Sequence, residues 1–216
     1  MTYTGAVTPG GPPDVRELPD LTISKLSVGP MDNNAYLLRC RHTGDQVLID
    51  AANEPERLLD FIGPDGLSTV VTTHRHGDHW QALAAVVDAT GARSLAHEAD
   101  AGEIPVVTGT LTDGESVAVG ACRLEVIHLV GHTPGSIALL YHDPGGHPHL
   151  FTGDSLFPGG PGRTTNPQEL ASLMDDLEEK IFGRLPDETW FYPGHGNDST
   201  LGKERPAIPE WRARGW

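Results

Sequence analysis

Short stretches in which apolar and polar residues alternate, or in which β-branched residues cluster, recur along the chain from residue 21 to residue 192. Such stretches are typical of β-strands, because successive side chains of a strand face opposite sides of a sheet. We expect strands over Leu21–Leu26, Ala35–Cys40, Gln46–Asp50, Thr69–Thr73, Ser94–Ala96, Ser116–Val119, Ala121–Leu129, Ser136–Tyr141, His149–Thr152 and Thr189–Tyr192.

Three other segments have the spacing of a helix that buries one side: Pro55–Ile62, His79–Ala89 and Pro167–Phe182. The third is the clearest, because Asn166 is a favourable N-cap, Pro167 suits the first turn and Gly183 can end the helix. Strands, helix, strand, helix, strands, helix and strand follow one another along the chain. This order predicts a mixed α/β fold in which the helices pack on the outside of the sheets.

The length of 216 residues suits one domain. Residues 1–20 include a run of glycine and proline at positions 9–13, which predicts an irregular N-terminal segment. We therefore place the domain at residues 21–205 and a C-terminal tail at residues 206–216.

The net charge of −15 disfavours binding to nucleic acids, whose phosphates are also negative. No apolar run approaches the length of a membrane span, and Met1–Leu21 lacks the pattern of a signal peptide. The expectation is a cytoplasmic protein without nucleic-acid or membrane partners. Cys40 and Cys122 are expected to be small buried residues, and a disulfide between them is not required. The sequence does not indicate an oligomeric state.

The segment from Thr73 to His79 combines three histidines and an aspartate at the end of an apolar β-branched run. On a strand His74 and His76 point to the same side, and a turn at Gly77 can bring Asp78 and His79 to the same place. Imidazole and carboxylate groups are ligands that zinc accepts at about 2.0–2.2 Å. The segment therefore predicts a metal site.

Three further candidates follow predicted strands and have a glycine beside them: His132, Asp154 and His195. Each alone is an ordinary loop residue. Together with the four residues of the first segment they form a set of seven, which suits two metal ions that share one bridging ligand.

The motifs His74-x-His76-x-Asp78-His79, Gly131-His132-Thr133-x-Gly135-Ser136, Thr152-Gly153-Asp154 and Gly194-His195 resemble those of the metallo-β-lactamase superfamily, in an order most similar to its glyoxalase II branch. The resemblance implies an αβ/βα sandwich, a four-layer fold with two facing sheets and helices outside. It also implies that Asp154 bridges two metals, the first held by His74, His76 and His132 and the second by Asp78, His79 and His195. Asp50 would orient the ligand loop without touching a metal.

The resemblance implies a metal-dependent hydrolase that cleaves a small ester or thioester with a hydroxide bridging two metal ions. Zinc is the expected metal, and iron or manganese would accept the same ligands. Asp78 and His79 are candidate catalytic residues as well as ligands. Because neither cysteine lies in a ligand motif, the chain does not resemble the zinc β-lactamases that use a cysteine ligand.

Glyoxalase II hydrolyses an acylglutathione, and Arg163 matches the first basic residue with which that family binds glutathione. Thr165 and Asn197 stand where the family has tyrosines, and we find no counterpart of its C-terminal helical domain. Recognition of glutathione, of another thiol carrier or of a non-thiol ester therefore stays open.

Several alternatives remain. A persulfide dioxygenase would hold one iron with His74, His132 and Asp154, and the chain also resembles that branch at Gly162-Arg163-Thr164. A lactonase and a metal-binding protein without catalysis are further options, since a fold does not fix a function.

Overall fold

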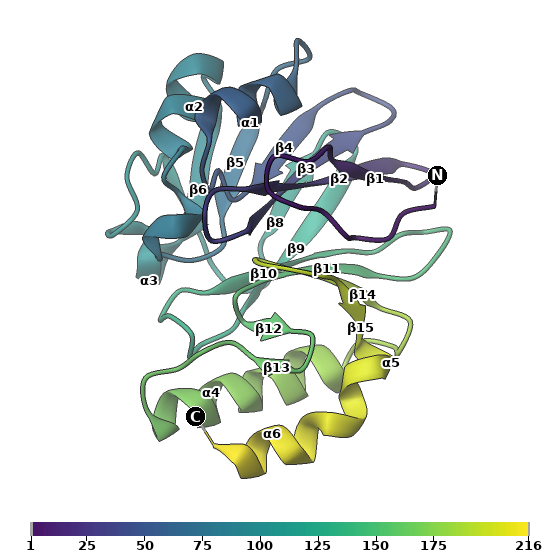
Figure 1. The fold of residues 1–216 in the computed structure, drawn as a ribbon, viewed down its shortest axis with the longest axis vertical. Coiled ribbons are helices and arrows are strands. Elements are labelled where there is room, and N and C mark those ends of the chain that lie inside the picture. Colours follow the sequence, from purple (N-terminus) through teal and green to yellow (C-terminus); the bar gives the residue numbers. More distant parts are fainter. Residues whose placement is uncertain (1, 216) are drawn as a thin grey trace.

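The computed structural model describes residues 2–215 and shows two β-sheets that pack face to face, with helices on the two outer faces (Figure 1). This arrangement confirms the predicted αβ/βα sandwich. Met1 and Trp216, the ends of the predicted N-terminal segment and C-terminal tail, lie outside the described residues.

The first sheet has seven strands in sequence order: β1 (Asp14–Glu17), β2 (Leu21–Val28), β3 (Asn33–Cys40), β4 (Gln46–Ile49), β5 (Thr69–Thr72), β6 (Arg93–His97) and β7 (Gly109–Leu111). Strands β1 to β4 pair antiparallel, whereas β4 to β7 pair parallel. Parallel neighbours need crossover connections. These connections contain α1 (Pro55–Ile62), the 3-10 turn η1 (Gly77–His79), α2 (Leu83–Thr90) and α3 (Glu98–Ala101).

The second sheet has the order β15-β14-β11-β10-β9-β8. Its strands are β8 (Ser116–Val119), β9 (Cys122–His128), β10 (Ile137–Tyr141), β11 (His149–Gly153), β14 (Trp190–Pro193) and β15 (Ser199–Thr200). A small hairpin, β12 (Leu156–Phe157) and β13 (Gly160–Pro161), follows β11. The outer face carries α4 (Pro167–Asp176), the π-helical turns η2 (Leu177–Phe182), α5 (Leu201–Glu204), η3 (Arg205–Ala207) and α6 (Ile208–Arg214).

Three apolar clusters hold these layers together. The cluster between the sheets includes Tyr36, Phe151 and Tyr192, whose rings contact one another at centroid distances of 4.7–5.7 Å. The other two lie under the helices, around Leu58 and Leu83 on the first sheet and around Leu173 and Trp211 on the second. Full burial of such a side chain contributes about 1.5–3 kcal/mol, so the two sheets are fixed relative to each other.

Part of the segment predicted as irregular is a strand in the structure, and the predicted C-terminal tail contains a helix. Residues 14–17 were expected to be irregular but form β1, because an edge strand needs only backbone pairing with β2 and no apolar alternation. In the predicted tail, residues 208–214 form α6, because Trp211 is only 2 % exposed and packs against Phe182.

Two predicted helices have different limits. The helix expected from His79 begins at Leu83, because the amides of Gln81 and Ala82 bond to the carbonyls of Ala52 and Ala51 instead of to a helical turn. The helix over 167–182 begins as predicted, with Asn166 accepting from the amide of Glu169, but becomes π-helical at Leu177.

Cys40 and Cys122 are buried free thiols, as expected. Among residues 2–215, no helix combines the length and the apolar character that a membrane crossing requires.

Candidate metal centre

The loops that follow four strands meet at one edge of the sandwich. His74, His76, Asp78 and His79 follow β5, His132 lies between β9 and β10, Asp154 follows β11, and His195 follows β14. Backbone hydrogen bonds join these loops, between the two sheets from the amide of Ile137 to the carbonyl of Thr73 (3.0 Å) and within the second sheet from the amide of Gly194 to the carbonyl of Gly153 (2.8 Å). All seven predicted side chains are thereby brought together.

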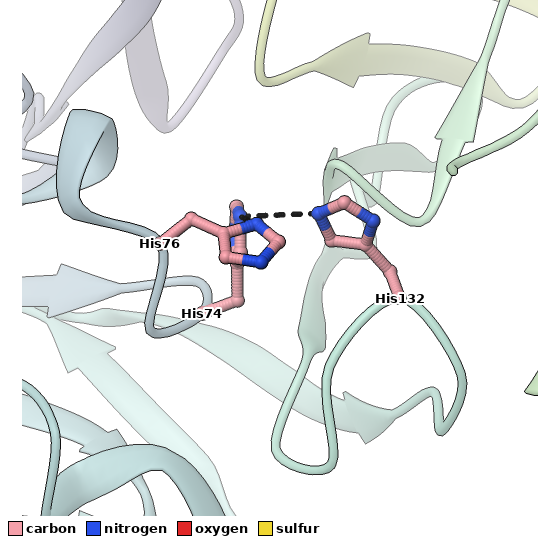
Figure 2. Close-up of side chains that lie close together, drawn as sticks. All are labelled: His74, His76 and His132. Atoms are coloured by element: carbon pink, nitrogen blue, oxygen red, sulfur yellow. Dashed lines mark hydrogen bonds between the residues drawn. The ribbon is translucent and has the colours of Figure 1, made fainter. Parts of the chain in front are cut away.

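The first group consists of His74, His76 and His132. His74 Nε2 lies 3.1 Å from His76 Nδ1 and 3.3 Å from His132 Nε2. In Figure 2 the first two rings come from one loop and face the ring of His132 from another. Three imidazole nitrogens that converge at this spacing can bind one metal ion.

The second group consists of Asp78, His79 and His195. Asp78 Oδ2 lies 3.4 Å from His79 Nε2 and 3.3 Å from His195 Nε2. The side-chain amide of Asn33 donates to the same carboxylate oxygen at 2.9 Å and holds it in place. The group therefore has the donor set of a second metal site.

Asp154 lies between the two groups. Its Oδ2 is 3.7 Å from His132 Nε2 and 3.4 Å from His195 Nε2, and its Oδ1 is 3.4 Å from His79 Nε2. A carboxylate in this place can contact metal ions on both sides.

In three of the histidines a hydrogen bond from Nδ1 holds the ring so that Nε2 faces the centre. Nδ1 of His79 lies 2.8 Å from Asp50 Oδ2, that of His132 lies 2.7 Å from the Arg163 carbonyl, and that of His195 lies 2.9 Å from the Met31 carbonyl. Each acceptor requires that Nδ1 carry a proton, so Nε2 is the nitrogen that each ring can offer to a metal ion at the centre.

Asp50, to which the resemblance assigned an orienting role, lies against the ligand segment but outside the centre. Its carboxylate accepts from the amide of Thr73 (2.7 Å), from the hydroxyl of Thr73 (2.8 Å) and from His79 (2.8 Å). The Thr73 hydroxyl, having donated to Asp50, can accept from His74 Nδ1 at 3.0 Å. One buried carboxylate thus orients imidazoles of both groups without reaching the centre itself.

Two buried atoms at the centre have no hydrogen-bond partner among the described residues: His79 Nε2 and Asp154 Oδ1. A buried polar atom without a partner costs about 1–3 kcal/mol. Both face the same space, and both can donate a lone pair once His79 has released its Nε2 proton, so a metal cation fits the arrangement and would satisfy both.

The charges at the centre are strongly coupled. Burial alone would lower the pKa of His79, but the carboxylates of Asp50 and Asp154 outweigh it and raise that pKa to about 10. Burial alone would raise the pKa of Asp154, but His195 and His79 hold it well below its usual range. Burial, with the neighbouring His79, pushes the pKa of His74 far below the usual value. The centre is therefore suited to concentrated positive charge.

Two glycines are required by the crowding around Asp154. A Cβ on Gly194 would lie 2.1 Å from Asp154 Oδ1 and 2.8 Å from His79 Cε1. A Cβ on Gly162 would lie 1.6 Å from the Asp154 carbonyl oxygen. Any side chain at either position would displace the candidate ligands.

The loop that carries His195 is fixed from the first sheet. Lys25 Nζ, fully buried, contacts Asp198 Oδ1 at 2.6 Å and donates to the Gly196 carbonyl at 2.7 Å. The side-chain amide of Asn34 donates to the carbonyls of Pro193 and Gly196, both at 2.9 Å.

Arg163 lies beside the centre, and its side chain lines a surface cavity of about 490 Å³ together with Arg214, Thr164 and Leu170. Its carbonyl has a role that the sequence did not suggest, since it accepts from His132. Asn33 and the Met31 carbonyl were also missed. The only signal for Asn33 was a pair of asparagines at the start of an otherwise apolar strand.

The family model described as "Metallo-beta-lactamase superfamily" matches residues 28–195, a range that includes all seven side chains of the centre. The chain belongs to this superfamily. This member of the metallo-β-lactamase superfamily is similar to several curated proteins and to several solved structures.

A hydroxyacylglutathione hydrolase of Polaromonas sp. is 37% identical over 166 residues, which cover 76% of this chain and 62% of that protein. The chain thus spans less than two thirds of the length of this relative. Further relatives with the same name, such as that of Fuscovulum blasticum at 38% identity, confirm the resemblance to the glyoxalase II branch.

Two solved structures are also similar. ETHE1 from Myxococcus xanthus has 28% identity and a TM-score of 0.77, with 88% of this chain and 84% of that one covered. TTHA1623, solved in a di-iron-bound form, has 33% identity and a TM-score of 0.69, with 84% and 96% covered.

Proposed function

We propose that this protein is a metal-dependent hydrolase that cleaves a small acyl thioester, as a member of the glyoxalase II branch would. The observation that supports the proposal most is the pair of unpartnered buried atoms, His79 Nε2 and Asp154 Oδ1, within a complete set of seven candidate ligands. The names of the curated relatives support the thioester as the substrate class.

The proposed centre holds two metal ions. His74, His76 and His132 would hold one, Asp78, His79 and His195 the other, and Asp154 would contact both. Zinc fits a donor set of imidazoles and carboxylates, and the di-iron form of TTHA1623 supports a pair of ions while making iron the main competitor.

A bound pair of divalent ions supplies ionised water near neutral pH and polarises the carbonyl of the substrate. The protein's own contribution is to hold the donors. Asp50 and the carbonyls of Arg163 and Met31 keep the proton of each outer imidazole nitrogen away from the centre, so that no histidine has to rotate when metal binds. Arg163 would attract the negative charge of a thiol carrier at the cavity beside the centre.

The test uses the full chain, freed of metal and then loaded with zinc, iron or manganese. We expect two zinc ions per chain and hydrolysis of acylglutathione or of another acyl thioester. His79→Ala should lose metal and turnover, whereas His42→Ala, which changes an exposed histidine outside the centre, should keep both.

Metal-loaded protein that cleaves neither thioesters nor lactones would contradict the proposal. One iron per chain with oxygen consumption on a persulfide would favour the dioxygenase alternative, which needs only His74, His132 and Asp154.

A further inference from the structure

A buried carboxylate outside the centre joins two of the loops that supply it. Asp100 lies on α3 and is fully buried. Its Oδ2 accepts from the backbone amide of Arg75 (2.9 Å) and from the hydroxyl of Thr133 (2.6 Å), and its Oδ1 accepts from the amide of Gly135 (2.8 Å).

These donors flank the candidate ligands of the first group. Arg75 lies between His74 and His76, and Thr133 directly follows His132. The loop contact is close, since a Cβ on Gly135 would lie 2.6–2.8 Å from atoms of Asp100. Asp100 is therefore the one side chain of the described residues that accepts hydrogen bonds from both loops.

Burial of the Asp100 carboxylate costs free energy, and the hydrogen bonds from these two loops offset that cost. No lysine, arginine or histidine of residues 2–215 pairs with it in a salt bridge. Burying a carboxylate is unfavourable unless it is hydrogen-bonded, and hydrogen bonds to a charged group are stronger than those between neutral groups. The carboxylate thus stabilises one relative placement of the two loops.

We propose that Asp100 is a positioning residue, which holds the loop of His74 and His76 against the loop of His132 so that the three imidazoles converge. The purpose of this placement rests on the proposed metal centre, whereas the placement of the two loops itself can be measured without metal. Asp100 does not contact the centre and takes no part in the reaction itself.

The test compares Asp100→Asn with Glu98→Gln, which makes the same change on the exposed face of the same helix. We expect Asp100→Asn to lower zinc affinity about 10–100-fold, to change the visible spectrum of the cobalt-loaded protein, and to speed amide hydrogen exchange in both loops of the metal-free protein. Glu98→Gln should match the original protein in all three measurements. If Asp100→Asn does not fold, Thr133→Val removes one of the three donors and should shift each measurement in the same direction by less.

An Asp100→Asn protein with lower thermal stability but unchanged zinc affinity, cobalt spectrum and loop exchange would overturn the proposal and leave Asp100 a residue of the fold alone. The test of the Asp100 role can be distinguished from the test of the proposed function. A protein that binds zinc without thioesterase activity would refute the function, while zinc affinity still decides the role of Asp100. If the original protein bound no metal, unchanged loop exchange in Asp100→Asn would refute the positioning role and faster exchange in both loops would support it.

Discussion

The first sheet supplies four candidate ligands from residues 74–79, whereas the second sheet supplies His132, Asp154 and His195 from three separate loops. The first set is preorganised by one strand end, one 3-10 turn and Asp50. The second set depends on contacts between the sheets, such as those of Lys25 with the His195 loop. Local sequence can specify the first arrangement, while the second exists only when both sheets are packed.

The largest effect should come from Asp154, the carboxylate that lies between the two groups. Asp154→Ala should release both metal ions and lower turnover at least about a thousandfold, since a metal contributes several kcal/mol to catalysis and each ~1.4 kcal/mol is tenfold in rate. His195→Ala should lose one ion and retain the other in the first group. Metal analysis of both variants checks these numbers. Loss of the same number of ions from both variants would contradict the different roles of Asp154 and His195.

The dependence of the His195 loop on the first sheet predicts a large effect of Lys25→Met. The change leaves Asp198 buried without its cation, which should lower the free energy of unfolding by about 3–5 kcal/mol. Urea denaturation measures this, with Lys203→Met as the control at an exposed lysine. A loss no larger than that of the control would show that the loop does not need the pair.

His149 on β11 is a buried histidine of the second sheet that lies outside the centre, with Nδ1 2.8 Å from Tyr192 Oη. Burial, with His147 and Arg16 nearby, lowers its pKa to about 3. The folded protein therefore favours the neutral ring of His149. The contribution of this preference to the free energy of unfolding is complete above pH 6.5, the usual pKa, and is lost as the pH falls toward 3.

The expected result for His149→Phe is a loss of stability relative to the original protein that shrinks by about 3 kcal/mol between about pH 6.5 and pH 4. Denaturation of both proteins across this range provides the measurement. A constant difference would show that His149 does not titrate with folding.

The smallest effect should come from Arg163. Its guanidinium is exposed, so Arg163→Ala should raise KM for an anionic thioester by no more than about fivefold and leave kcat nearly unchanged. Arg93→Ala, at an exposed arginine of β6, is the control. A kcat that falls with KM unchanged would instead indicate that the variant disturbs the carbonyl that accepts from His132.

The elements with strong patterns were predictable because their signals are local. Asn166, Pro167 and the apolar stripe specified the start of α4, and the β-branched run at 69–73 specified β5. The strand at 14–17 and the helix at 208–214 were missed, because the first depends on backbone pairing with β2 and the second on a pocket for Trp211 between distant elements.

The sequence by itself determined the kinds of donor groups, the segment 74–79 and the resemblance that linked His132, Asp154 and His195 to it. Tertiary structure decided which groups surround those donors. The carbonyls of Arg163 and Met31, the side-chain amide of Asn33 and the carboxylate of Asp100 have no ligand motif and act only through contacts across 25 to 164 positions of the chain. The physical reason is that a motif records the chemistry of a side chain, whereas the direction in which an imidazole points depends on partners that only the packed sheets bring near.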